Sequence, residues 1–418
     1  MNRIHFKALN VGLRGATLIL RFFLVFFLAK FLEPSDVGVY GLVGSAVAFS
    51  LYIIGLDFYV YSSRELLAIE RKIWGRYLKG QAALVIVMYS FFLAAMFFVY
   101  EYGLYSKEIV AWLSLLALLE LCCQELNRLH IVTAEPLFSS FVLFVRQGLW
   151  IVVVLLLMVV SDERRTINTV FVCWSVACIL SLALSTIRLS QLSLGGWSQT
   201  IDWVWVRSGV KTALLFLVGT LFVKAILTFD RFYFEFFAGR DLVGVYVFFM
   251  GVATALFSFL DAGVFVFAYP ELVKCVNEKK FHVFRKAIFS LLVQVCALSL
   301  AFIVVSSISI PWLVEWISRP VYAQHSSLYF WLLTAMVLYG LSMVSHFGLY
   351  ALRKDTHILI AHVFGFSGFF ASMFFMPKFG VDLELVVPLG VCVSFSLILL
   401  FKSIFFVQCY SVLSETID

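Results

Sequence analysis

The sequence is poor in charged residues. Only 13% of its 418 residues are Asp, Glu, Lys or Arg, whereas 63% are hydrophobic. Soluble globular domains usually carry about 25% charged residues. Proline is also scarce, and its seven copies lie at or near the ends of long apolar stretches, where proline is tolerated in helices. This composition excludes an ordinary soluble domain and predicts a polytopic membrane protein.

Several catalytic and cofactor-binding motifs are missing. The chain has no G-x-x-x-x-G-K-[ST] phosphate loop and no H-E-x-x-H zinc motif. None of its eight cysteines falls in an expected outer loop, and they form no cluster with histidines, so we expect neither disulfides nor a metal site. No expected outer loop is long enough to form a domain. We therefore predict no enzymatic activity, no cofactor and no nucleic-acid partner.

The apolar stretches are long enough to cross a bilayer as helices, which takes about 20 residues. Twelve such stretches can be marked. They are residues 10–32, 38–61, 78–100, 109–127, 137–160, 167–188, 211–237, 243–269, 287–309, 327–350, 357–377 and 383–408. The sequence thus predicts an all-α integral membrane protein with about twelve transmembrane helices.

Lys and Arg are distributed unevenly between the loops. With the N-terminus inside, nineteen fall in inner segments and six in outer segments. Because inner loops are enriched in Lys and Arg, this difference predicts that both termini are cytoplasmic. The segment 189–210 contains Trp197, Trp203 and Trp205. We expect it to form a helix on the inner membrane surface.

A short motif recurs in the two halves of the chain. Asp36-Val-Gly-Val-Tyr40 returns as Asp241-Leu-Val-Gly-Val-Tyr246, and each copy opens the second expected helix of its half. The repeat predicts two pseudo-symmetric six-helix bundles around a central cavity. The expected domains are an N-terminal bundle at 1–190, a cytoplasmic interfacial linker at 191–210 and a C-terminal bundle at 211–418.

Charged side chains lie within the expected helices. Arg14 and Arg21 are seven residues apart, so both lie on one face of the first helix. The other six are Arg146, Lys224, Asp230, Arg231, Asp57 and Asp261. A charge facing lipid costs at least about 2.5–3.5 kcal/mol. These groups must therefore face water, one another or a ligand, and because five are cationic they predict a cavity for an anionic substrate.

Other interpretations of these residues stay open at this stage. Arg14 could pair with Asp57, since both lie toward the inner end of neighbouring helices. Arg231 and Asp230 could reach the outer interface by snorkelling. His346 and His362 are single histidines in apolar helices, where helix packing is a simpler role than proton relay.

The sequence resembles the polysaccharide transporter family, in particular Wzx-type O-antigen flippases of the multidrug/oligosaccharidyl-lipid/polysaccharide (MOP) exporter superfamily. The resemblance covers the first 80 residues and the start of the second half. Its motifs are Gly12-Leu13-Arg14-Gly15, Leu28-Ala29-Lys30-Phe31-Leu32-Glu33-Pro34, Val37-Gly38-Val39-Tyr40, Gly55-Leu56-Asp57, Ser63-Arg64-Glu65-Leu66 and Asp241–Tyr246.

The resemblance implies a flippase of the bacterial inner membrane. Such a protein moves an undecaprenyl-diphosphate-linked oligosaccharide from the cytoplasmic to the periplasmic leaflet by alternating access, driven by an ion or proton gradient. A polysaccharide polymerase and a chain-length regulator would be candidate partners. The expected substrate-binding residues are Arg14, Arg21, Arg146, Lys224 and Arg231. The expected ion-coupling or gating residues are Asp57 and Asp261.

Two other functions compete with this one. The first is a multidrug or cation antiporter of the same superfamily, against which the excess of Arg and Lys within the helices argues. The second is a membrane enzyme that modifies sugars, such as an acyltransferase. That enzyme would need an acid–base constellation near the membrane surface, which the sequence does not contain.

Overall fold

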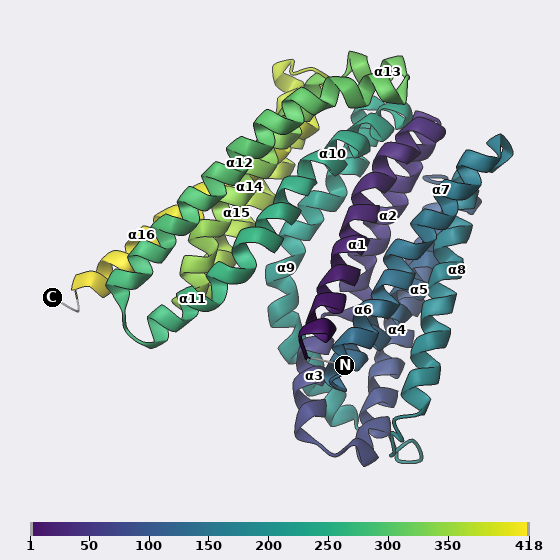
Figure 1. The fold of residues 1–418 in the computed structure, drawn as a ribbon, viewed down its shortest axis with the longest axis vertical. Coiled ribbons are helices and arrows are strands. Elements are labelled where there is room, and N and C mark those ends of the chain that lie inside the picture. Colours follow the sequence, from purple (N-terminus) through teal and green to yellow (C-terminus); the bar gives the residue numbers. More distant parts are fainter. Residues whose placement is uncertain (1–2, 416–418) are drawn as a thin grey trace. The chain divides into compact units, whose positions relative to one another are not determined.

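The computed structural model describes residues 3–415 and is almost entirely helical, without strands in that range (Figure 1). Eleven helices are long and apolar enough to cross a membrane, or twelve when α9 (Trp203–Ala238) is counted as one span. This result confirms the expected fold class of an all-helical membrane protein with about twelve spans.

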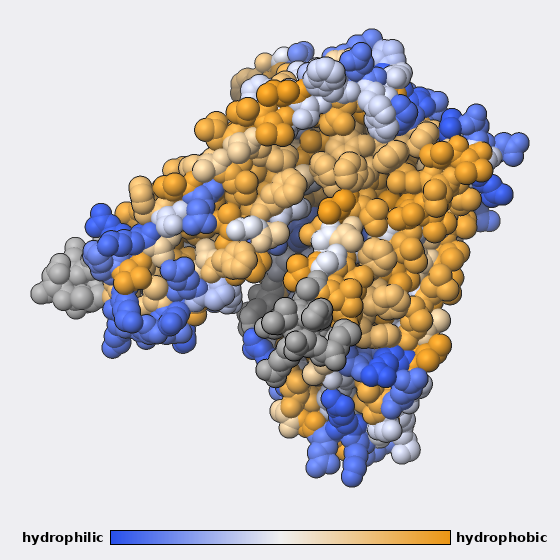
Figure 2. All heavy atoms as spheres, in the orientation of Figure 1, coloured by the Kyte–Doolittle hydropathy of each residue, from blue (hydrophilic) through white to orange (hydrophobic). Residues whose placement is uncertain are grey.

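The chain forms two compact units. The first contains residues 1–32 and 39–221, and the second contains residues 33–38 and 222–418. The units therefore divide within α9, whereas the sequence suggested a linker at 191–210. The expected domain boundaries stay a prediction. On the visible face, apolar side chains cover the flanks of the helices and hydrophilic side chains gather near their ends (Figure 2).

The first unit has six membrane-spanning segments, and its hydrophobic core includes Val43, Leu116 and Phe171. The fifth segment is continuous from α6 through a π-helical turn, η2, to α7. The elements up to α9 are α1 (Arg3–Phe31), α2 (Pro34–Gly55), α3 (Tyr59–Ala68), η1 (Arg71–Ile73), α4 (Trp74–Glu101), α5 (Lys107–Val132), α6 (Pro136–Phe144), η2 (Val145–Leu149), α7 (Trp150–Val160), η3 (Asp162–Arg164) and α8 (Ile167–Ser190).

The second unit is built around α16, which packs along both α14 and α15. A second π-helical turn, η4, joins α10 to α11. The elements after α9 are α10 (Arg240–Leu260), η4 (Asp261–Phe265), α11 (Val266–Asn277), α12 (Phe281–Ile317), α13 (Pro320–Gln324), α14 (Ser327–Ala351), α15 (Asp355–Phe375), η5 (Met376–Phe379) and α16 (Leu383–Glu415).

The two copies of the repeated motif lie against each other through their glycines. A Cβ atom at Gly38 would lie 2.9 Å from the Arg240 carbonyl oxygen, and one at Gly244 would clash with the Pro34 carbonyl. Both contacts fall within the second unit, which includes the first turn of α2. Only glycine allows the backbones to approach this closely, which gives the motif a packing role.

The segment expected as an interfacial helix is different in the structure. Residues 191–202 are irregular, and the helix begins only at Trp203. The irregular stretch is held on the first unit by backbone hydrogen bonds from Gly195 N to Arg71 O (3.1 Å) and from Gly75 N to Gly195 O (2.7 Å). Trp205 is buried with Phe58 instead of lying on a surface. The prediction of a surface helix over 189–210 was therefore wrong.

Candidate functional site

Arg14 and Arg21 lie on the exposed face of α1. Arg14 Nε donates to Ser140 Oγ at 2.9 Å, and Arg21 Nη1 donates to Gln147 Oε1 at 3.3 Å. Their partners come from α6 and η2 and repeat the seven-residue spacing of the two arginines. Both partners are neutral, so hydrogen bonds hold the guanidinium groups without cancelling their charge. The face is suited to an anionic ligand, because each arginine retains donors and a full positive charge.

Asp57 is not the hydrogen-bond partner of Arg14. It is buried, and it lies in the break between α2 and α3. Leu56 and Asp57 both have left-handed backbone angles, with φ of 50° and 49°. The other candidate coupling residue, Asp261, is exposed and is the first residue of η4. Asp57 follows α2 and Asp261 follows α10, which are the second spanning helices of the N-terminal and C-terminal halves. Both aspartates thus lie where such a helix departs from regular α-helical geometry.

Arg146 lies in the interior of the first unit, on η2. Its Nη1 atom is 3.4 Å from Glu120 Oε2, and both side chains are about 7% exposed. Trp174 Nε1 also donates to Glu120, at 2.7 Å, and the Trp174 ring stacks on Trp150. Arg146 has no evident partner in the sequence, and the structure supplies one in Glu120. Its assignment to substrate binding stays a prediction, and the buried carboxylate partner argues against it.

The remaining candidates belong to the second unit. Lys224 is exposed on α9, and Arg231 is half-buried about two turns further along the same helix. Asp230 is fully buried and accepts hydrogen bonds from the Tyr246 hydroxyl at 2.8 Å and from the backbone N–H of Arg231. Asp230 therefore does not snorkel to an interface.

Three charged residues within the spans were missed as intramembrane groups. Glu120 and Glu125 lie inside the stretch 109–127, which the sequence analysis had already marked as a helix. Lys402 lies inside the stretch 383–408 and was one of the nineteen Lys and Arg residues counted as inner, yet its side chain is fully buried in α16. Their positions in the sequence could have revealed them, because all three residues fall within the apolar stretches that were marked as helices.

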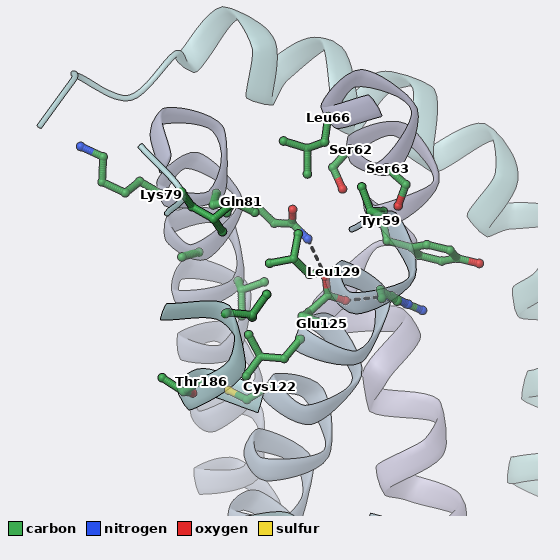
Figure 3. A pocket seen from close by; sticks show the side chains of 18 of the residues that line it. Tyr59, Ser62, Ser63, Leu66, Lys79, Gln81, Cys122, Glu125, Leu129 and Thr186 are labelled. Carbon is green, nitrogen blue, oxygen red and sulfur yellow. Dashed lines mark hydrogen bonds and ion pairs between the residues drawn. The ribbon is translucent and has the colours of Figure 1, made fainter. Parts of the chain in front are cut away.

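A cavity of about 690 Å³ opens in the first unit between α3, α4, α5 and α8 (Figure 3). Most of its lining is apolar. Its polar part is a chain in which Glu125 accepts hydrogen bonds from Gln81 Nε2 and from Arg128 Nη1 at 2.6 Å. The Arg128 guanidinium also lies 3.5 Å from the centre of the Tyr59 ring. Arg128 is thus held by a carboxylate and an aromatic face.

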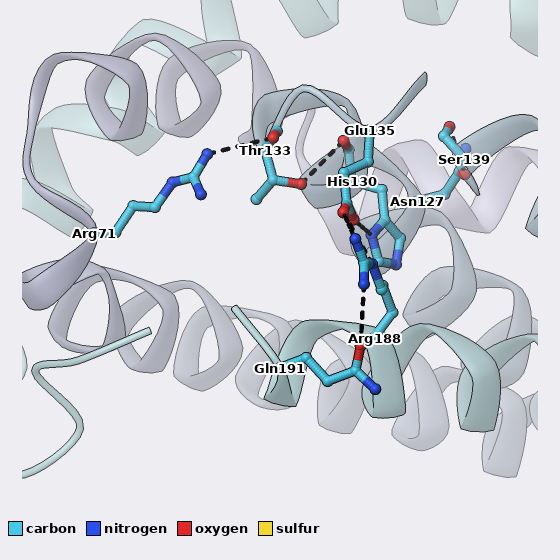
Figure 4. Close-up of polar contacts among 8 residues, drawn as sticks. All are labelled: Arg71, Asn127, His130, Thr133, Glu135, Ser139, Arg188 and Gln191. Carbon is cyan, nitrogen blue, oxygen red and sulfur yellow. Dashed lines mark hydrogen bonds and ion pairs between the residues drawn. The ribbon is translucent and has the colours of Figure 1, made fainter. Parts of the chain in front are cut away.

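A second polar cluster lies where α5 connects to α6 (Figure 4). Arg188 donates to Glu135 through both Nε and Nη2, and the buried His130 Nδ1 lies 3.4 Å from the same carboxyl group. Partial burial raises the pKa of Glu135, but hydrogen bonds and charge from Arg188 and His130 outweigh it, so the pKa is lowered overall. This cluster fixes the α5–α6 turn to the end of α8.

Among the residues that the structure describes, no group of three or more His, Cys, Asp or Glu side chains is placed to hold a metal ion. Comparison with protein-family models found no match, and comparison with curated proteins found none either.

Comparison with solved structures found full-length matches at low sequence identity. One is the inward-facing conformation of a multidrug resistance MATE family transporter of the MOP superfamily, with a TM-score of 0.74, 12% identity and 96% of each chain covered. A second is MATE in the bent conformation, with a TM-score of 0.53, 13% identity and coverage of 98% of this chain and 97% of that chain.

A third match is the Vibrio cholerae MATE transporter VcmN, with a TM-score of 0.52, 14% identity and coverage of 97% of this chain and 98% of that chain. At such low identity the likeness speaks for the arrangement of the helices alone. The chain has the fold seen in MATE transporters of the MOP superfamily.

Proposed function

We propose that this protein is an alternating-access transporter that moves a diphosphate-linked, lipid-anchored oligosaccharide from the cytoplasmic to the periplasmic leaflet of the bacterial inner membrane. The observation that carries the proposal is the pair of exposed arginines on α1, which hydrogen-bond only the neutral Ser140 and Gln147 among the described residues. The fold, shared with MATE transporters, supports a transport function.

The physical argument begins with the cost of these charges. Arginine stays protonated in a membrane, and a charge facing lipid costs at least about 2.5–3.5 kcal/mol. Two such charges on one face of a spanning helix need water or a counter-charge. A diphosphate supplies that counter-charge, and a planar guanidinium binds phosphate oxygens through two parallel hydrogen bonds. The lipid tail of the substrate can stay in the bilayer.

The other charged residues take different roles in this proposal. Lys224 and Arg231, both on α9, stay candidate substrate-binding residues by their charge. Asp57 and Asp261 are the candidates for ion coupling or gating, because each lies at an irregular turn of a spanning segment. Glu120 and Arg146 neutralise each other inside the first unit.

Multidrug or cation antiport is the second candidate function. The observation that favours it is the likeness to a structure described as a multidrug resistance transporter. A cationic drug would need an uncompensated carboxylate in the transport path. In the described part of the first unit the buried Glu120 is instead paired with Arg146, and the exposed charges on α1 are positive. The electrostatics of this unit therefore favour an anionic substrate.

The test is substitution of the α1 arginines in the native strain, with surface glycan and lipid-linked glycan as readouts. Arg21→Ala should lower surface glycan at least about tenfold, since losing one charge-assisted contact costs about 1.5–3 kcal/mol. Complete lipid-linked units should accumulate while protein abundance stays normal. Arg21→Lys should retain part of the activity, because the charge remains and the fork geometry is lost.

Arg164→Ala is the matched control, since Arg164 is an exposed arginine on the short η3 turn. It should leave surface glycan unchanged. Normal surface glycan in an Arg14→Ala, Arg21→Ala double variant would contradict the flippase. Raised drug susceptibility in the deletion strain with normal glycan would favour multidrug antiport.

A further inference from the structure

Lys402 is a fully buried lysine in the middle of a spanning helix. It lies on α16, within the span Leu383–Tyr410, and its side chain is 0% exposed. Its Nζ atom has no hydrogen-bond partner, and no carboxylate pairs with it among the residues that the structure describes. A lysine is seldom buried completely unless it is paired. The residue therefore calls for an explanation beyond packing.

Tight packing encloses this amine. On α14, a Cβ atom at Gly348 would clash with the Phe406 ring, one turn after Lys402. On α15, a Cβ atom at Gly365 would clash with Ile398, one turn before Lys402. The adjacent Ser403 hydroxyl lies 3.1 Å from the Ser345 hydroxyl of α14. Glycine contacts on both sides of Lys402 thus hold α16 closely against α14 and α15.

Two imidazoles from these neighbouring helices stack on each other, and the charge of Lys402 acts on one of them, His346. His346 of α14 and His362 of α15 have ring centres 6.2 Å apart and nearly parallel planes. His346 interacts electrostatically with both Lys402 and His362, and its Nδ1 atom is buried without a hydrogen-bond partner. The Tyr350 ring stacks on His346 from the next turn. Three basic groups from three helices therefore share one buried site.

The charge state follows from this geometry. A buried ammonium without a partner carries a desolvation penalty of several kcal/mol, and protonated imidazoles beside it would add repulsion. The packed arrangement is therefore most stable with an uncharged amine. Protonation becomes favourable only when water reaches the amine, and this requires α16 to separate from α14 and α15.

We propose that Lys402 is a proton-binding site whose occupancy is linked to loosening of α16 from α14 and α15, with His346 and His362 as the neighbouring groups. The proposal goes beyond the proposed substrate, because it assigns proton linkage to the second unit and to a basic cluster instead of Asp57 or Asp261. The proposal does not depend on which substrate the protein transports.

A second cavity, of about 520 Å³, lies toward the ends of the helices that carry this cluster. It lies at the ends of the same three helices and is lined by Leu352, His357 and Gln408, among others. These residues are five or six positions, or about 9 Å of helix rise, from His346, His362 and Lys402 respectively. His357 Nδ1 is also buried without a hydrogen-bond partner. The cavity therefore brings solvent within about two helical turns of the amine.

The test is hydrogen exchange of the full-length protein in lipid nanodiscs at about pH 6 and about pH 8, corrected for the intrinsic pH dependence of exchange. We expect wild-type peptides of α16 to exchange at least about tenfold faster at the acid pH. Lys402→Met should remove this difference and stay protected at both values. Lys286→Met, which changes an exposed lysine on α12, should behave as wild type.

Three results would overturn the proposal. Equal protection of wild type at both pH values would show that no proton binds in the accessible range. A pH response that survives in Lys402→Met but is lost in His346→Gln, His362→Gln would move the site to the histidines. A wild-type response that disappears when gluconate replaces chloride would identify an anion site. The assay contains no glycan, so its outcome is independent of the flippase test.

Discussion

Both units bury a carboxylate beside an aromatic hydrogen-bond donor, Glu120 in the first and Asp230 in the second, but these two carboxylates have different partners. In the first unit, Glu120 accepts from Trp174 and has Arg146 3.4 Å away. In the second unit, Asp230 accepts from the Tyr246 hydroxyl and from the backbone N–H of Arg231. Glu120 thus belongs to a buried ion pair, whereas the hydrogen bonds of Asp230 come from neutral groups and the Arg231 side chain acts on it only through its charge.

This difference between the units predicts which substitution destabilises each of them most. A buried ion pair contributes little net stability, yet breaking it strands the remaining charge at a large cost. A carboxylate held by neutral donors loses only the hydrogen bond that is deleted. The first unit should therefore depend on Glu120 as the counter-charge of Arg146, and the second should depend on single hydrogen bonds.

The largest expected effect comes from Glu120→Gln, which removes the counter-charge of Arg146. The free energy of unfolding in detergent, measured by denaturant titration, should fall by about 3–5 kcal/mol. Glu120→Gln combined with Arg146→Met should recover most of this loss, because glutamine still accepts from Trp174 and no charge is stranded. A double variant as unstable as the single one would show that the ion pair is not the cause.

A smaller effect is expected from Tyr246→Phe in the second unit. It deletes the hydroxyl donor to Asp230 and should lower the free energy of unfolding by about 1.5–3 kcal/mol, the usual value for a hydrogen bond to a charged group. Asp230→Asn should cost less, since the amide oxygen can still accept from Tyr246. If Tyr246→Phe costs as much as Glu120→Gln, the contrast between the units fails.

The smallest effect is expected at the partly exposed pair of Glu135 and Arg188. Because the pKa of Glu135 is lowered in the folded protein, its stabilisation is present above the unfolded carboxyl pKa of about 4.3 and is lost as pH falls through the folded value. Glu135→Gln should therefore lower the Tm at neutral pH, by less than about 2 °C, and leave it unchanged in acid.

Glu278→Gln is the control for this pH experiment. Glu278 pairs with Lys280 at 2.7 Å, and the hydrogen bond from Lys280 lowers its pKa, but the pair is exposed at the turn after α11. Its removal should leave the Tm unchanged at both pH values. A Tm difference between Glu135→Gln and wild type that persists in acid would exclude the ionised carboxyl as its source.

The membrane-spanning helices were predictable because the length of an apolar stretch is enough to identify one. The stretch 357–377, for instance, is observed as α15, which covers Asp355–Phe375. The stretch 38–61 was expected as one helix, but α2 ends at Gly55 and α3 begins at Tyr59. A break of this kind depends on backbone angles at two residues and leaves no trace in hydropathy.

The site was less predictable than the fold. Arg14 and Arg21 could be placed on one face of α1, because helical periodicity fixes their direction. The partner of Arg146 could not be found, since Glu120 is 26 positions away and on another helix. Lys402 could not be recognised as a buried group, because its burial depends on how α14 and α15 pack against α16. Side-chain partners across helices depend on packing, which a single sequence does not reveal.

The backbone is strained at the joint between α2 and α3, residues 56–58. Two consecutive residues without glycine's freedom, Leu56 and Asp57, hold left-handed angles, at a cost of about 1–2 kcal/mol each. Straightening the joint into continuous α-helix would release that energy. This energy is comparable to that of one hydrogen bond to a charged group, about 1.5–3 kcal/mol, so a single new contact at the joint would be enough to offset it.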